Sequence, residues 1–456
     1  MIKKGISYKN AAILILLICN CTLANRTIYV DNNGSGDFNN IQAAIDDAND
    51  GDIILVADGT YTGDGNRDID FKGKAITLKS QNGAEKCIID CNGSPNDPHR
   101  GFYFHSQEDL NSVLQGFTIT GGHSGYPIER GGGISCNESS PQIKDCVLTG
   151  NTAFLGGGIA IYNSSVHIID CIIKKNTASY GGGGISTGYG STLIKGCLIE
   201  GNYAIFDSGV AGIKGDGGGI LIERNNIIVN IIECTVTGNH GNGGGIFLGS
   251  GANVTNSIIY GNTYDFQFYT NEVLVSYRYN NNTDDRHPQL PLSPQISIEY
   301  CLVGKGTESD FFFSYPEDAN KLLIGQWIQG DPCFASEGYW DTKGTFYDQL
   351  DDVWADGDYH LKSQAGRWNP NSQSWVIDDV TSPCIDAGDP NSPIGLEPFP
   401  NGGFINMGAY GGTSEASKSY FGKPVCTTIV AGDINGDCKV DVMDIMILVS
   451  HWLEEH

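Results

Sequence analysis

The stretch "GGGISCNESSPQIKDCVLTGN", Gly131–Asn151, is the first of five related copies along the chain. Four further copies begin at Gly156, Gly182, Gly217 and Gly243, and each opens with the same three glycines followed by isoleucine. A period near 25 residues, built from short apolar runs and glycine-rich corners, indicates a repeat architecture in which each copy packs on its neighbours. The repetition is therefore a sign of architecture rather than of catalysis.

Three columns of residues align the five copies. They are an isoleucine column (Ile134, Ile159, Ile185, Ile220, Ile246), a cysteine column (Cys146, Cys171, Cys197, Cys234, then Ser257) and an asparagine column (Asn151, Asn176, Asn202, Asn239, Asn262). Between them lie runs such as "VHIIDCII", which have the alternation and β-branched character of strands. The pattern predicts an all-β solenoid of coiled strands whose coils stack at about 4.8 Å.

Each column has a structural explanation. Stacked isoleucines and cysteines fill a core, and asparagines pass hydrogen bonds from coil to coil, which satisfies polar groups that are buried at a corner. The glycines supply positive φ angles or close backbone approach at another corner. For the cysteines we favour small buried side chains, with metal binding and disulfide bridging as the alternatives.

The repeats resemble those of right-handed parallel β-helix proteins, among them pectate-lyase-like enzymes, and the "GGGI" and "GN" spacing is similar to that of bacterial polymorphic outer-membrane proteins. The resemblance covers residues 27–330. It includes the start "IYVDNNGSGDFNNIQAAIDDANDGDIILVADGTYTG". Here Ile41, Ala44, Ile45 and Ala48 predict a short amphipathic helix that caps the open end of the solenoid before a strand at 53–56.

Residues 1–24 have the pattern of an export signal, with Lys3, Lys4 and Lys9 before an apolar run and small residues at Thr22 and Ala24. The run is too short for a membrane anchor, and a lipid anchor is the minority interpretation. We expect a secreted, extracellular or cell-surface protein, most simply a monomer, in a compartment that permits disulfides.

Loss of this signal removes three lysines and no acids, so the formal net charge goes from −26 to −29. Such a balance disfavours nucleic acid and anionic lipid as partners. It also disfavours a polyanionic substrate unless calcium bridges the two.

Residues 331–422 resemble the segment that closes many secreted β-helix proteins, on the motifs "GDYHLKS", "SPCIDAGDP" and "INMGAYGGT". Five of the six tryptophans lie between Trp327 and Trp375. We expect these indoles to fill a core or cover the solenoid, with a sugar-stacking platform as the alternative. Cys333 and Cys384 could be bridged within this region.

Residues 423–456 carry a calcium-loop pattern, "DINGDCKVDVMD". Oxygen ligands for one Ca²⁺ would come from the side chains of Asp433, Asn435, Asp437, Asp441 and Asp444 and the carbonyl of Lys439. The segment resembles one half of a dockerin, which implies a cohesin-like or cell-surface partner. It departs from that family in having one loop instead of two and Cys438 where glycine is usual, and Cys438 could pair with Cys426.

No known catalytic set of the β-helix lyases, polygalacturonases or pectin methylesterases is present; "NHG" at 239–241 is only a weak echo. Long corner loops at His123–Arg130 and Tyr203–Asp216 instead indicate a binding trough, since insertions in solenoids collect on one face. Ordinary variation in loop length is the alternative. The candidate substrate-binding residues are Phe154, Tyr180, Glu129, Arg130, Asp207, Lys214 and Asp216.

Together these features predict a secreted β-helix protein that binds or degrades extracellular polysaccharide. If it is an enzyme, the resemblance implies a polysaccharide lyase or a glycoside hydrolase. The alternative is a non-catalytic adhesin or a structural cell-surface protein. An enzyme needs paired acid–base groups, or a base with a metal, in one trough, whereas a binder needs only aromatic and hydrogen-bonding groups.

Overall fold

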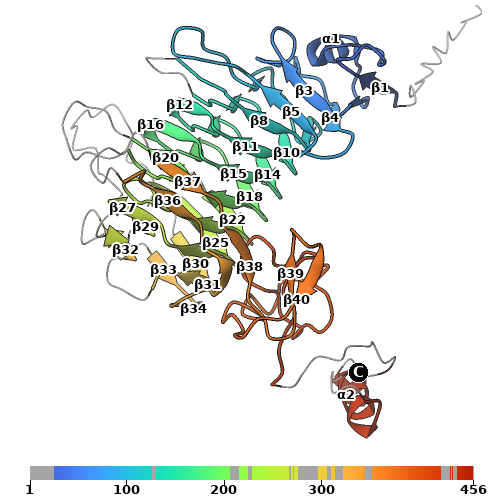
Figure 1. Cartoon of the computed structure of the whole chain (residues 1–456), viewed down its shortest axis with the longest axis vertical. Helices are drawn as coiled ribbons and strands as arrows, with labels where there is room; N and C mark the ends of the chain where they lie inside the picture. Colours follow the sequence, from blue (N-terminus) through green and yellow to red (C-terminus); the bar gives the residue numbers. More distant parts are fainter. Residues whose placement is uncertain are drawn as a thin grey trace, which may run out of the picture.

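The computed structural model describes residues 25–125, 130–205, 215–223, 228–265, 269–270, 272–275, 296–305, 310–313, 322–344, 352–422, 432, 434 and 439–454. Over these ranges short strands coil around one long apolar core, and each coil stacks on the one before it (Figure 1). The chain is a parallel β-helix, which confirms the predicted fold class. None of the helices in these ranges has the length and apolar character needed to cross a bilayer.

Three parallel sheets form the walls of the solenoid. The first sheet contains β1 (Thr27–Val30), β2 (Ile53–Val56), β4 (Thr77–Ser80), β7 (Val113–Gln115), β10 (Gln142–Lys144), β14 (His167–Ile169), β18 (Leu193–Lys195), β22 (Ile228–Ile232), β25 (Gly251–Thr255), β30 (Ile296–Glu299) and β33 (Leu322–Ile324). The second contains β3 (Gly59–Thr62), β5 (Cys87–Asp90), β8 (Thr118–Thr120), β11 (Val147–Thr149), β15 (Ile172–Lys174), β19 (Leu198–Glu200), β23 (Thr235–Thr237), β26 (Ile258–Tyr260), β31 (Cys301–Val303) and β34 (Trp327–Ile328). The third contains β6 (Phe102–Phe104), β9 (Ile134–Asn137), β13 (Ile159–Tyr162), β17 (Ile185–Gly188), β21 (Ile220–Ile222), β24 (Ile246–Leu248), β29 (Val273–Val275) and β32 (Phe311–Phe313).

Two smaller sheets lie at the corner between the second and third sheets. One is parallel and contains β12 (Thr152–Leu155), β16 (Thr177–Gly181) and β20 (Tyr203–Ala204). The other is an antiparallel pair of β27 (Thr263–Asp265) and β28 (Tyr269–Thr270).

The isoleucine column lies in the third sheet, in register. Ile159 pairs with Ile134 on one side and Ile185 on the other, and the column continues through Ile220 and Ile246. All five are fully buried. Burying one such side chain contributes about 1.5–3 kcal/mol, so the stack is a main source of stability.

The cysteine column lies at the tight turn between the first and second sheets. Cys146, Cys171, Cys197 and Cys234 are all buried and all free thiols. The residue before the cysteine has positive φ, as at Asp170 (φ 53°), which turns the chain within one residue. The interpretation as small buried side chains is confirmed for these residues.

The asparagine column is a hydrogen-bonded ladder, as predicted. The main-chain N and the Nδ2 of Asn151 both donate to Oδ1 of Asn176, at 3.1 and 3.0 Å. The same pair of bonds repeats through Asn202, Asn239 and Asn262. Since all five side chains are fully buried, the ladder satisfies polar groups that no water reaches.

The glycine runs occupy the opposite side of this corner. Gly131 has a φ of 73°, a conformation that costs other residues about 1–2 kcal/mol. A Cβ on Gly132 would lie 2.5 Å from the carbonyl oxygen of Thr152. The glycines therefore supply both a positive φ and close backbone approach, as predicted.

A short helix, α1 (Ile41–Asp47), lies at the amino-terminal end of the solenoid (Figure 1). Its buried residues are Ile41, Ala44 and Ile45, and the Asn40 side chain caps it by accepting from the main-chain N of Ala43 at 2.9 Å. The predicted capping helix and the strand that follows it are confirmed.

After Ile328 the chain forms antiparallel pairs that fold back along the outside of the solenoid (Figure 1). These pairs are β35 (Phe334–Ser336) with β38 (Asp358–Leu361), β36 (Tyr339–Asp341) with β37 (Val353–Ala355), and β39 (Arg367–Asn369) with β40 (Ser374–Val376). Together with the irregular chain up to residue 422 they cover part of the second sheet, where Leu198, Ile258 and Leu302 share a core with Phe334 and Tyr359.

Two tryptophans attach this closing region to the flank of the solenoid. Trp354 is 4% exposed, lies against Gly201 and Gly238, and donates from Nε1 to the Glu200 carboxylate at 3.1 Å. Trp340 donates to the Gly238 carbonyl oxygen at 2.8 Å. These indoles cover the solenoid wall rather than present a sugar platform.

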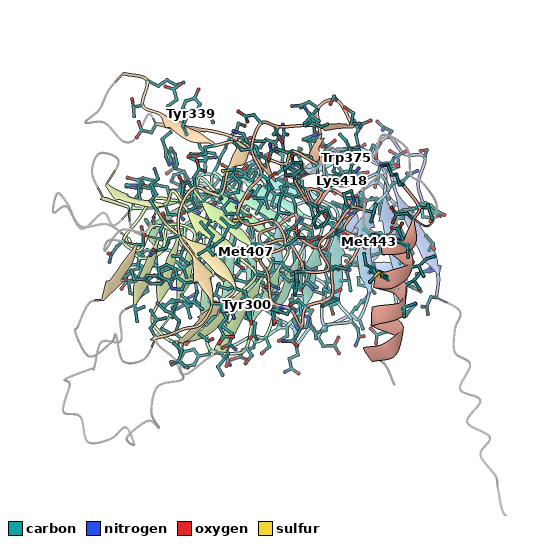
Figure 2. The ribbon with its side chains drawn as sticks, turned by 90° about the horizontal axis from the view of Figure 1, so that it is seen from below. Tyr300, Tyr339, Trp375, Met407, Lys418 and Met443 are labelled. Carbon is teal, nitrogen blue, oxygen red and sulfur yellow. The ribbon has the colours of Figure 1, made fainter. Side chains whose placement is uncertain are left out.

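Other contacts in the closing region differ from the prediction. Cys333 and Cys384 are free thiols, so the bridge considered between them is not formed. Lys418 lies over the Trp375 ring, with Nζ 4.3 Å from the ring centroid (Figure 2). The cation therefore covers one face of this indole.

Candidate functional site

A pocket of about 390 Å³ opens on the outside of the solenoid where the third sheet begins. It is lined by Asp68, Asp70, Pro98, His99, Arg100, Tyr103, His105 and His123. No sequence-based expectation pointed to it. We call it the histidine pocket.

Three consecutive coils build the histidine pocket. Ile69 bridges to Phe102 of β6, which pairs with Ile134 of β9. His123 joins from the next corner, where its main-chain N donates to the His99 carbonyl oxygen at 2.7 Å. Strand pairing thus brings together side chains that are far apart in the sequence.

His99 is held between two carboxylates. Its Nδ1 is 2.5 Å from Oδ2 of Asp68, and its Nε2 is 3.3 Å from Oδ1 of Asp97. The other oxygen of Asp68 accepts from the main-chain N of Arg100 at 2.9 Å. These contacts fix the orientation of the His99 ring in the pocket.

The environment of His123 is determined by burial. Burial lowers its pKa from the ordinary value of 6.5, because desolvation disfavours the charged imidazolium. Its ring is therefore neutral at neutral pH and can accept a proton. The pocket thus holds one imidazole that two carboxylates orient and another that burial keeps neutral.

Aromatic and cationic groups form the floor of the pocket. Tyr103 stacks on His105 with ring centroids 4.0 Å apart, and the Arg100 guanidinium lies 5.0 Å from the Tyr103 ring centroid. Flat rings beside hydrogen-bonding groups are what sugar-binding sites present.

The same arrangement continues along the solenoid. Arg100 donates to the Arg130 carbonyl oxygen at 3.0 Å. The Arg130 guanidinium lies 4.2 Å from the ring centroid of Tyr162, which meets the half-exposed Tyr189 edge to face at 5.4 Å. Glu223 pairs with Arg130 at 3.3 Å. We call the surface from the histidine pocket to Tyr189 the axial surface.

The structure places the predicted trough residues as follows. Arg130 lies on the axial surface, next to Arg100 of the pocket. Phe154 and Tyr180 stack on each other at 5.1 Å in the small parallel sheet, with Tyr180 41% exposed. Asp216 accepts from the Asn242 side chain at 2.8 Å. Bridges between successive coils link Asp216 to Gly181, Gly181 to Leu155, and Leu155 to Arg130. Glu129, Asp207 and Lys214 lie outside the described residues.

The predicted calcium loop is described only in part, because Asp433, Asn435 and Asp437 lie outside the described residues. Asp444 is buried and accepts from the main-chain N of Ile434 at 2.6 Å and of Asp441 at 2.7 Å. Both oxygens of its carboxylate thus accept main-chain hydrogen bonds. Lys439 is exposed beside it. Within the described ranges no three His, Cys, Asp or Glu side chains are placed to share a metal ion.

The loop leads into α2 (Val442–Glu454) (Figure 2). Its apolar side chains from Val442 to Val449 are largely exposed; Met443 and Ile445 are 53% and 58% exposed. The carboxylate of Asp444 in its first turn stabilises the helix amino terminus.

One sequence signal could have located the histidine pocket. Three of the nine histidines, His99, His105 and His123, fall within 25 residues. They were missed because this part of the chain precedes the regular repeats, so no alignment of copies shows which residues share a corner.

No curated protein sequence matches this chain. The family model described as "Disaggregatase related" matches residues 345–388, a segment of the closing region. Among solved structures, the crystal structure of pectate lyase Pel9A is similar at 16% sequence identity, over 84% of this chain and 96% of that chain, with a TM-score of 0.42.

Proposed function

We propose that this chain is a secreted enzyme that binds an extracellular polysaccharide along the axial surface and cleaves it in the histidine pocket. The observation that carries the proposal is the pair of imidazoles in one pocket. Two carboxylates hold the ring of His99, and burial lowers the pKa of His123. We assign His99 as the acid and His123 as the base of this pocket.

Cleavage of a glycosidic bond needs both groups. The bridging oxygen must receive a proton as its bond to carbon breaks, and a proton must leave either an attacking water, in hydrolysis, or the sugar carbon, in β-elimination. His99 is placed to give the first proton and His123 to take the second. His105 is exposed, and the face of its ring that does not stack on Tyr103 can receive a sugar.

Both ends of the sequence support an extracellular role. Residues 1–24 have the composition of an export signal. At the other end, the calcium-loop pattern and the exposed apolar side chains of α2 support attachment to a cohesin-like or cell-surface partner. We propose that Ca²⁺ orders this segment and that α2 contacts the partner.

The experiment is a screen of the full chain against a panel of polysaccharides that reads both unsaturated products and new reducing ends. We expect product with at least one polymer, and loss of that product in His123→Gln. His167→Gln, on the outer face of the first sheet, is the matched control and retains activity. Binding without any product would favour the non-catalytic adhesin instead.

A further inference from the structure

The closing region carries a cluster of large apolar side chains on its surface. Ile377 and Leu396 are 73% and 74% exposed, and three phenylalanines are roughly half exposed. Exposed apolar clusters of this kind mark surfaces that another group covers. We call these five residues the closing-region patch: Ile377, Leu396, Phe399, Phe404 and Phe421.

Hydrogen bonds hold the segments that carry the patch side by side. The main-chain N of Ser419 donates to the Pro400 carbonyl oxygen at 2.9 Å, and the main-chain N of Lys418 donates to the Gly366 carbonyl oxygen at 2.9 Å. Residue 366 precedes β39, and the partner strand β40 ends next to Ile377. The patch therefore comes from neighbouring segments of the closing region rather than from scattered positions.

The helix α2 presents a second apolar surface. Its members follow the i, i+3, i+4, i+7 spacing that places side chains along one face of a helix, and all are exposed; we call them the α2 stripe: Val442, Ile445, Met446 and Val449. Figure 1 shows α2 beyond β39 and β40, apart from the rest of the described chain. A helix of 13 residues is only marginally stable in water unless its apolar face is packed. The stripe thus needs a surface that covers it.

The charges beside the two apolar surfaces are complementary. Lys418 lies next to the segments of the patch, with its Nζ over the Trp375 ring, and it pairs with no carboxylate among the described residues. Acidic residues precede the α2 stripe, at Asp433, Asp437 and Asp441. A cation that adjoins one surface therefore complements carboxylates that adjoin the other.

The connection between the two surfaces favours a contact within one chain. Residues 423–441 join the closing region to α2, and a chain of that length spans about 60 Å at most. The stripe therefore meets the patch of its own chain at an effective concentration of ~10⁻³ M. In dilute solution this exceeds the concentration of a second copy or of a free partner.

We propose that the α2 stripe docks on the closing-region patch of the same chain, so that one contact covers both surfaces. The helix then occupies a second position, which the connecting residues permit. Met443 and Leu448 lie outside the stripe and stay available to the partner proposed above. The contact is independent of cleavage in the histidine pocket.

Hydrogen exchange of the full chain in millimolar calcium tests the contact, because the amides of a short helix exchange slowly only while the helix is packed. The test variants are Ile377→Asp and Phe399→Asp, which place a charge on two different segments of the patch. We expect the α2 amides to exchange about tenfold faster, or more, in each variant than in wild type. Ile228→Asp is the matched control, because Ile228 is an exposed isoleucine of β22, in the first sheet, and its substitution should leave α2 exchange unchanged.

Thermal unfolding should be the same in all four proteins, which would show that the substitutions leave the solenoid and the closing region folded. Equal α2 exchange in the four proteins, whether fast or slow, overturns the proposal. Protection of α2 that increases with protein concentration also overturns it and assigns the stripe to a second copy. Polysaccharide cleavage is measured separately, so a failure of the proposed function would leave this result unchanged.

Discussion

The Glu272 carboxylate terminates the asparagine ladder by accepting two hydrogen bonds from Asn262, one from the main-chain N at 3.1 Å and one from Nδ2 at 2.7 Å. Its other oxygen accepts from the main-chain N of Gly261 at 2.8 Å. Without it, the last asparagine would leave buried donors unpaired, which costs about 1–3 kcal/mol for each group.

Burial raises the pKa of Glu272 to about 7 from 4.5. The folded protein therefore keeps this proton over a range in which the unfolded chain has released it, so its contribution to stability falls as pH rises from 4.5 to 7. The shift corresponds to about 3 kcal/mol at most. Urea unfolding of wild type and Glu272→Gln at pH 5 and pH 8 should show a smaller loss of stability with pH in the variant. Glu299→Gln, at an exposed position, should behave like wild type.

The contact of Trp354 with Gly238 should make this glycine sensitive to any side chain. A Cβ at Gly238 would lie 1.9 Å from Cη2 of Trp354, so Gly238→Ala should displace the β36–β37 pair and cost about 2–4 kcal/mol. Gly150→Ala is the matched control, because the φ of Gly150 is 65° and that of Gly238 is 62°. A Cβ at Gly150 would meet only Thr120 Oγ1, at 3.5 Å. It should cost only the backbone strain, about 1–2 kcal/mol.

Thermal unfolding and proteolysis of the closing region would measure both changes. If the two alanine variants lose equal stability, strain alone accounts for the effect and the indole contact contributes nothing.

The pH dependence of cleavage should follow His123. Because burial lowers its pKa below 6.5, the neutral base should persist at more acidic pH than an ordinary histidine would allow, and kcat/KM should fall as pH drops through that lowered value. A profile of kcat/KM between pH 4 and 8 tests this. An acid limb above the ordinary histidine value would assign the base to another group.

The carboxyl-terminal loop should bind one Ca²⁺. Asp444 already faces the loop amides, and its side chain is shorter than the glutamate usual at this position, so we expect weak affinity, about 10⁻⁴ to 10⁻³ M. Calorimetry on the full chain, oxidised and reduced, should show this site in wild type and in Glu454→Gln but not in Asp444→Asn. Equal heats in all three proteins would place the binding elsewhere.

The sequence by itself was sufficient for the solenoid and its columns. Because every coil repeats the same path, residues such as Ile159 and Asn176 recur at one position and stack on their own kind, and the repeat shows this directly. It did not reveal Glu272, which ends the ladder with a different residue type. Nor did it show that Cys333 and Cys384 remain free.

Only the tertiary structure decided the candidate site. Asp68 and His99 are 31 residues apart in the sequence and in contact in the pocket, and His99 reaches His123 across a further irregular corner. Corner loops change length without changing the distance between coils, so sequence spacing no longer reports spatial spacing where the repeats are irregular. Strand pairing alone determines which side chains meet there, since it holds consecutive coils about 4.8 Å apart whatever the loops between them contain.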